Sequence, residues 1–166
     1  KGSSTYGDVA CYADKVINAP NGSIEGDFVF GIIDGGNTLS QYLGNDTSIV
    51  LPQNYKGENY AIGNKLFYNC TNITNVTIPN TVTHIGKDAF KGCGNLSDIT
   101  LSNSVTRIGD SAFADTKWWD NQALGFVYLD NCLLGFKHNG TIPDNVELAL
   151  NVTEGTRVIA DNAFKN

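Results

Sequence analysis

Cysteine and histidine are the residues of this sequence with the most recognisable site chemistry. The chain has four cysteines and two histidines, His84 and His138. A cysteine nucleophile needs a solvent-facing thiolate with an imidazole within hydrogen-bond reach, for which Cys93 and His84 are the candidate pair. Zinc sites commonly contain a C-x-x-C pair, and phosphate sites a glycine-rich loop between strand and helix; the sequence has neither. We therefore expect no catalytic residues, no metal site and no cofactor.

Two adjacent tryptophans, Trp118 and Trp119, form the second candidate site, within the string ADTKWWDNQAL. Exposed indole rings can stack on a sugar ring or anchor a protein partner. The structural alternative is that one ring packs beneath the segment that follows. A coplanar, solvent-facing pair would favour a sugar ligand, and buried rings would favour protein binding or a spacer role.

A repeat of 23 residues determines where these side chains lie. Residues 76–96 (VTIPNTVTHIGKDAFKGCGNL) align with residues 99–116 (ITLSNSVTRIGDSAFADT), and the same register extends back through residues 62–70. After an interruption it reappears as VTEGTRVIADNAF at residues 152–164. Self-similarity at a fixed period is the sequence signature of a solenoid, in which each coil contacts its neighbours.

Side-chain alternation predicts the structure of one coil. In residues 76–78 the two β-branched apolar side chains share one face, and Pro79 ends the strand because it has no N–H to donate. Residues 82–85 are predicted to form a second strand. Gly86 is predicted to permit a backbone bend, and a helical or 3-10 turn then places Phe90 in the interior. One coil cannot bury this face alone, so the coils must stack.

Two similar segments predict β-hairpins ahead of the repeats. DFVFGIIDGGNTLSQYLG at residues 27–44 and GFVYLDNCLLGF at residues 125–136 each have an apolar run, a turn signal and a second apolar run. The chain is then two rounds of one scheme, a hairpin followed by repeats. Because it begins with Lys1 rather than Met, and the second round stops at Asn166, we expect a trimmed piece of a longer protein.

The string NLSDITLSNSVTRIGDSAF resembles the BspA-like leucine-rich repeat, also called the Treponema pallidum type, whose pattern is L-x-x-I-x-[IL]-P-x-[SV]-V-T-x-I-G-x-x-A-F-x-x-C. The match is specific for residues 60–116 and 150–164. Ser102, Thr116 and Ala160 depart from the proline, cysteine and glycine of the pattern. The resemblance implies a β-rich leucine-rich-repeat solenoid with coils of about 23 residues, short strands and helical or 3-10 turns, interrupted by inserted β-hairpins.

Proteins of this family are mostly bacterial surface or secreted proteins, and the roles suggested for them are adhesion and host-protein binding. The family has no shared catalytic residues, so none is carried over. The resemblance implies a non-enzymatic interaction module, extracellular or on the cell surface, whose partner is a protein of a host or a neighbouring cell. Glycan binding through Trp118 and Trp119, or a passive stalk, are the alternatives.

The predicted binding surface is the outward column of the main sheet. Its residues flank the inward apolar pairs, are short and mostly uncharged, and stack at the spacing of one coil. They are Asn75, Thr77, Asp98, Thr100 and Asn151, with Ser48, Val50 and Ala149 at the same positions. Extended sheet surfaces of solenoids are common binding sites. The alternative is that this column is only a soluble strand surface.

The same register predicts that Cys70 and Cys93 stack inside neighbouring coils and that His84 faces outward. Parallel side chains suit the disulfide torsion poorly, so we expect reduced thiols here. Cys11 and Cys132 have no such partner. A buried Cys93 and an outward His84 also disfavour a catalytic pair.

Composition limits the remaining function classes. Of 166 residues, 41% are hydrophobic and 17% charged, which suits a packed core, and the net charge of −6 would repel nucleic acid. No apolar run reaches 18 residues, so no membrane span is expected. The predicted organisation is an N-terminal segment with a hairpin at 1–47, leucine-rich repeats at 48–116, an insertion with the tryptophan pair and a hairpin at 117–147, and a final truncated repeat at 148–166.

Overall fold

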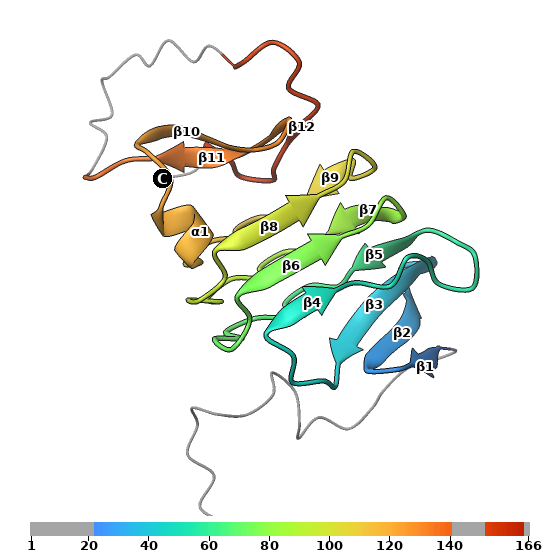
Figure 1. The fold of residues 1–166 in the computed structure, drawn as a ribbon. Coiled ribbons are helices and arrows are strands. Elements are labelled where there is room, and N and C mark those ends of the chain that lie inside the picture. The colour runs from blue at the N-terminus through green and yellow to red at the C-terminus, as the bar shows by residue number, and fades with distance from the viewer. Residues whose placement is uncertain (1–21, 141–151, 165–166) are drawn as a thin grey trace, which may run out of the picture.

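The computed structural model describes residues 22–140 and 152–164, which form a stack of coils with a hairpin at each end (Figure 1). The strands in chain order are β1 Ser23–Glu25, β2 Phe28–Ile33, β3 Gly36–Tyr42, β4 Ser48–Val50, β5 Tyr60–Ile62, β6 Asn75–Ile78, β7 Val82–Ile85, β8 Asp98–Leu101, β9 Arg107–Ile108, β10 Gly125–Leu129, β11 Cys132–Lys137 and β12 Val158–Ile159, and the helix is α1 Lys117–Asp120. No helix within these described ranges is long and apolar enough to cross a membrane.

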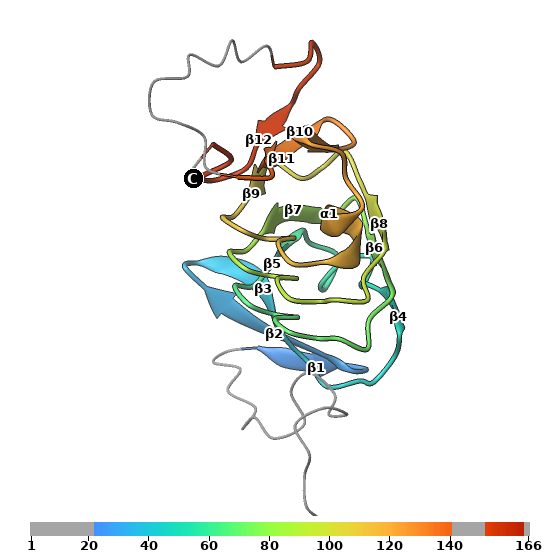
Figure 2. The same ribbon diagram turned by 90° about the vertical axis from the view of Figure 1, so that its left-hand side faces the viewer.

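Two sheets lie on opposite sides of the stacked coils (Figure 2). One has the order β4-β6-β8 and is parallel, and the other has the order β1-β2-β3-β5-β7-β9. Each regular coil gives one strand to each sheet, as β6 and β7 do on either side of Pro79. The β-rich solenoid predicted from the repeat is confirmed.

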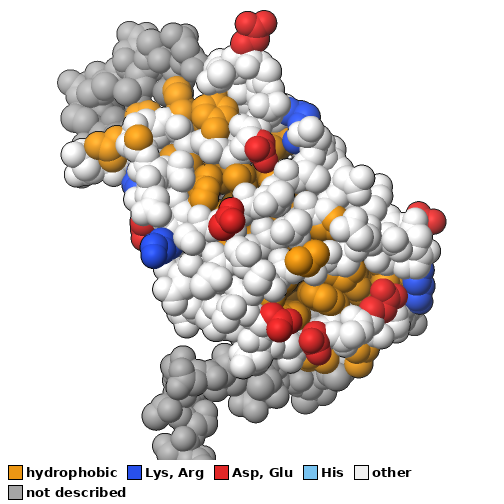
Figure 3. Space-filling view, viewed as in Figure 1, with side chains coloured by type: hydrophobic (Ala, Val, Ile, Leu, Met, Phe, Trp, Pro, Cys, Tyr) orange, Lys and Arg blue, Asp and Glu red, His pale blue; other side chains and the backbone are white. Residues whose placement is uncertain are grey.

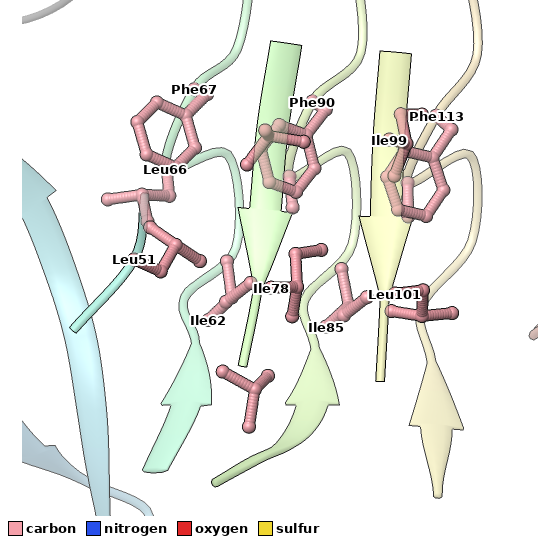
Figure 4. Packing of buried hydrophobic residues seen from close by; sticks show 14 of the residues in the cluster. Leu51, Ile62, Leu66, Phe67, Ile78, Ile85, Phe90, Ile99, Leu101 and Phe113 are labelled. Carbon is pink, nitrogen blue, oxygen red and sulfur yellow. The ribbon is translucent and has the colours of Figure 1, made fainter. Parts of the chain in front are cut away.

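Equivalent side chains of successive coils stack on one another to form the core. Phe67, Phe90 and Phe113 are buried, with ring centroids 5.0 and 5.3 Å apart and nearly parallel planes (Figure 4). Ile62 and Ile85 form a similar row beside them. Because each ring contacts the ring of the next coil, burial of one coil depends on its neighbours.

The glycine of the repeat is required because no side chain fits between neighbouring coils at this position. A Cβ on Gly86 would lie 2.6 Å from the backbone nitrogen of Asn64, and a Cβ on Gly109 would lie 2.5 Å from that of Lys87. Neither glycine has positive φ. The prediction of a glycine-dependent bend is therefore corrected: this glycine lets one coil approach the backbone of the coil before it.

A non-glycine residue with left-handed backbone lies two positions after the repeat glycine, and two positions after Ala160 in the last repeat. Lys65, Asp88, Ser111 and Asn162 have φ of 57°, 53°, 55° and 59°. The segment that follows Gly86 is therefore a tight turn and not a regular helical or 3-10 turn as predicted. Positive φ is uncommon for such residues, so its recurrence shows that every repeat adopts the same turn.

Main-chain hydrogen bonds join these turns into a ladder. In each regular coil, alternate N–H groups of the turn donate to carbonyls of the next coil. The bonds run from Lys65, Phe67 and Asn69 to Lys87, Ala89 and Lys91, and from Asp88, Phe90 and Gly92 to Asp110, Ala112 and Ala114, over 2.7–3.0 Å.

Two antiparallel strand pairs occupy the segments predicted to be hairpins, β2 with β3 and β10 with β11. The first turn has Asp34 and Gly35 at φ of 52° and 79°, and the second has Asp130 at 51°. Each pair continues into a parallel strand, because β3 pairs with β5 and β11 with β12. The second round therefore begins with the same topology as the first.

The last repeat is in register with the second hairpin. The N–H of Ala160 donates to the carbonyl of Leu133 over 2.9 Å, as the N–H of Gly63 does to the carbonyl of Leu39. Strand β12 therefore pairs with β11 in the same way as β5 pairs with β3.

The last repeat is out of register by one residue with the third coil, which is the coil that carries β8 and β9. Asp161 N–H donates to the carbonyl of Ile108, whereas in the preceding coils the repeat glycine makes this bond, as Gly109 does to Ile85. Ala160 stands at that glycine position in the sequence. Its Cβ is compatible with the shifted register, because the close backbone approach seen at Gly109 is absent there.

This shift leaves apolar side chains of the last repeat uncovered. Ile159 and Phe164 are 50% and 45% exposed, whereas the equivalent Ile108 and Phe113 are buried. The Phe164 ring lies edge-on to Phe126, with centroids 6.2 Å apart, and does not extend the phenylalanine stack. Apolar side chains accordingly gather over the β10–β11 hairpin (Figure 3).

Candidate interaction surfaces

The outward ladders of the β4-β6-β8 sheet have the register predicted from the repeat. Asn75 pairs with Asp98, and Thr77 pairs with Thr100. Ser48 and Val50 extend the same two rows on β4. Asn151, predicted to belong to this column, lies outside the described residues.

Strand alternation places these side chains on the surface. The inward residues of β6 and β8 are Val76, Ile78, Ile99 and Leu101, all buried. The outward Asp98 and Thr100 are exposed, and Asn75 and Thr77 are partly exposed. The surface over β6 and β8 is mainly uncharged and polar, with isolated acidic side chains (Figure 3).

The opposite sheet has a different character. Its outward pair His84 and Arg107 is exposed, and the Arg107 guanidinium forms an ion pair with Asp161 over 2.9 Å. Lys87 and Asp110 form a second ion pair nearby, over 3.1 Å, which holds the pKa of the Asp110 carboxyl below its ordinary value. In each of these two pairs, the positive charge is balanced by a carboxylate of the chain itself.

The tryptophan pair lies on α1, a single helical turn capped by a buried threonine. Thr116 Oγ1 accepts the N–H of Trp119 over 3.1 Å and donates to the carbonyl of Phe113 over 2.8 Å. Thr116 occupies the position where the family pattern has cysteine. The substitution thus supplies an N-cap that starts the helix.

The two indoles have different surroundings. Trp118 packs against the core, with its ring 6.4 Å from Phe113 and tilted by 60°. Its main-chain N–H donates to the carbonyl of Leu96 over 2.7 Å. The six-membered ring of Trp119 points its edge at Gly135, where a Cβ would lie 3.0 Å from Cη2. These rings therefore do not present the open, coplanar platform that would favour a sugar.

Lys137 anchors the helix to the second hairpin. Its Nζ donates to the main-chain carbonyls of Trp119, Asp120 and Gln122 over 3.1, 2.7 and 2.9 Å. Arg157 makes a similar connection from the last repeat, donating to the carbonyl of Val105. Sequence reasoning missed both residues, since a single Lys or Arg outside the repeat gives no signal of its target.

A cavity of about 340 Å³ lies between the third coil and the second hairpin. Trp119 forms part of its wall, together with the turn at 108–114, residues 134–136 of β11 and residues 160–163. The sequence did not predict it, because it results from the shifted register of the last repeat.

The cysteines differ from the predicted thiol stack. Cys70 is disulfide-bonded, so the prediction of a reduced thiol is wrong at that position. Cys93 is a free, buried thiol that donates to the carbonyl of Phe67 over 2.9 Å. Cys132 is also free and buried, and Cys11 lies outside the described residues. Cys93 faces the interior and His84 faces solvent, so the two do not form a catalytic pair.

We expect the Cys93 thiol to resist alkylation in the folded chain. Burial raises its pKa to about 12 from an ordinary 9.0. At pH 8 its thiolate fraction, and with it the rate of reaction with iodoacetamide, should fall by about 1,000-fold. Mass spectrometry of labelled peptides measures this, with the chain in urea as control; rapid labelling of native Cys93 would contradict the burial.

Comparison with known proteins gives the same assignment as the geometry. The model of the BspA type leucine rich repeat region matches residues 41–123, in six copies. The crystal structure of a Treponema pallidum leucine rich repeat protein is 30% identical, with a TM-score of 0.51, over 56% of this chain and 45% of that one. No curated protein matches the sequence.

A leucine rich cell surface protein of Faecalibacterium prausnitzii A2-165 is also similar, at 31% identity and a TM-score of 0.50, over 59% of this chain and 29% of that one. The matched region thus spans less than half of either relative. With the family match covering half of its residues and the coils stacked as described, the chain belongs to the BspA-type leucine-rich-repeat family.

Proposed function

We propose that this chain is a non-enzymatic interaction module, extracellular or on a cell surface, that binds a protein of a host or a neighbouring cell. The observation that carries the proposal is the outward face of β4-β6-β8, defined here by Asn75, Thr77, Asp98 and Thr100. These side chains are aligned across neighbouring strands at one coil spacing. Leucine-rich-repeat domains commonly mediate protein interactions, and a similar protein is described as a cell surface protein.

The chemistry of this face favours a protein partner. Short side chains on a sheet leave a flat surface that a second protein can approach closely. Asp98 is the one charged residue among the four, so binding here would depend little on salt. On the other sheet, the charge of Arg107 is already paired within the chain.

The test is a double substitution on this face, Thr77→Arg with Thr100→Arg. We expect at least about tenfold weaker binding of the fluorescently labelled chain to cultured epithelial cells, measured by flow cytometry, because two long cations would separate the surfaces. The matched control is Asn80→Arg with Asn103→Arg, which adds the same charge at exposed corners of the same two coils.

Equal loss of binding in both double variants would remove the sheet face as the explanation. If the unmodified chain binds neither epithelial cells nor bacterial cells, the chain is a passive stalk and the proposal fails. Urea unfolding of each variant shows that the comparison is made between folded proteins.

A further inference from the structure

The cavity between the third coil and the second hairpin interrupts the main-chain ladder. Its floor is the turn of the third coil, and its walls combine apolar and polar residues. Wall residues include Trp119, Leu134, Phe136, Ala160 and Ala163. A volume of about 340 Å³ lies at the lower end of the range of ligand pockets.

The floor carries main-chain N–H donors that have no acceptor in the part of the chain that the structure describes. In the two coils below, the equivalent N–H groups donate to the next coil, as Asp88 and Phe90 do to Asp110 and Ala112. The N–H groups of Ser111 and Phe113 are next in this ladder, and no acceptor for them is present in the described residues. Both residues line the cavity.

The third turn has the same conformation as the two below it, since Ser111 has φ of 55° and Asp88 has φ of 53°. Its donors therefore point in the same direction, away from the coil beneath. The last repeat would supply main-chain carbonyls as acceptors if it stacked in register on the third coil. The one-residue shift and the Ala160 Cβ hold it away, so the donors face the cavity instead.

The acidic residues at the cavity do not select its ligand. Asp110 and Asp161 both line it, but Asp110 is paired with Lys87 and Asp161 with Arg107. What remains for recognition is a pair of N–H donors two residues apart and an apolar wall. Carbonyls of a peptide main chain recur at this spacing, as the carbonyls of Asp110 and Ala112 do in the bonds beneath.

We propose that this cavity binds a short peptide segment of a protein partner. Two alternate main-chain carbonyls of the segment accept the N–H groups of Ser111 and Phe113, and an apolar side chain contacts Trp119. The site is separate from the β4-β6-β8 face and goes beyond the function proposed for it. Peptides bind to the edge of a sheet in the same way, because their main-chain groups pair with main-chain groups that have no partner in the protein.

The test is a titration of the ¹⁵N-labelled chain, followed by NMR. The probe is the acetylated and amidated peptide Gly-Lys-Asp-Ala-Phe-Lys-Gly, the sequence of residues 86–92, which covers the turn of the coil beneath in the chain itself. We expect downfield shifts of the Ser111 and Phe113 amide protons that saturate with a dissociation constant on the order of 1 mM. A peptide with Ala in place of Phe should bind more weakly.

Two variants show whether the cavity is the site. Ala114→Leu adds volume from the third coil, and Trp119→Ala removes the aromatic wall; each should weaken binding at least about fivefold. The spectrum of each variant reports whether it is folded. Thr77→Arg with Thr100→Arg should leave the titration unchanged, which separates this site from the sheet face.

Absence of peptide-induced shifts at Ser111 and Phe113 would overturn the proposal, as would peptide shifts confined to other residues. The same titration with N-acetylglucosamine tests the other class of ligand. If the sugar shifts these amides and the peptide does not, the cavity is a sugar site and the proposal is wrong.

Discussion

Phe90→Ala is expected to lower the free energy of unfolding by about 3–5 kcal/mol, the usual cost of removing a buried phenylalanine ring. Phe90 is fully buried between Phe67 and Phe113, with centroid distances of 5.0 and 5.3 Å. Removing the middle ring leaves a cavity and ends the stacking on both sides. The loss is a large part of the 5–15 kcal/mol that holds a typical domain together. Urea unfolding followed by circular dichroism measures it.

Phe164→Ala is the matched control for this prediction. Phe164 has the same place in the sequence repeat but is 45% exposed, and its ring contact is with Phe126. Its removal should cost less than about 1 kcal/mol. Similar losses for the two variants would mean that the last repeat stacks on the third coil after all, contrary to the shifted register.

The regular part of the fold followed from the sequence because its residues obey one local rule. The 23-residue period and strand alternation predicted that Thr77 would lie beside Thr100 and that Val76 and Ile78 would face the core, and the pairing confirms both. The turn at Asp34-Gly35 was likewise predictable, because type I′ turns need positive φ. Each of these features depends on residues close in sequence or on the equivalent residues of the adjacent coil.

The irregular part could not be predicted in this way, because it depends on competition between distant segments. The last repeat keeps the pattern of the others, yet pairs with β11 and shifts by one residue against the third coil. Ala160 was the one available signal, since every other coil has glycine there. The cavity follows from this shift.

The sheet face and the cavity therefore differ in how far the sequence alone could predict them. The face was predicted by residue number from the repeat alone, and its use in binding stays a prediction. Ser111 and Phe113 were assigned only to the repeat. That their N–H groups have no acceptor among residues 22–140 and 152–164 became visible once the ladder of hydrogen bonds was known. Main-chain donors leave no trace in a sequence, which is why sites built from them are found by structure.

Gly86→Ala is the second substitution with a large expected effect, since a single methyl group must separate two coils. Its Cβ would lie 2.6 Å from the backbone nitrogen of Asn64 and from the carbonyl carbon of Gly63, and backbone atoms cannot rotate away. Moving the coils apart would lengthen the main-chain bonds on either side, including that of Lys87 to the Asn64 side chain. We expect a loss of about 3 kcal/mol in the free energy of unfolding, at the upper end for overpacking.

Gly94→Ala makes the same chemical change eight residues away, where no atom lies within 4 Å of the added Cβ. It should leave stability unchanged or raise it by about 0.5 kcal/mol, because alanine restricts the unfolded chain. The urea concentrations at the unfolding midpoints of the two variants and of the parent chain measure these changes in stability. A loss for Gly94→Ala as large as that for Gly86→Ala would show that alanine is penalised for its backbone preference. A loss confined to Gly86→Ala would show that the closeness of the coils is what selects glycine in this repeat.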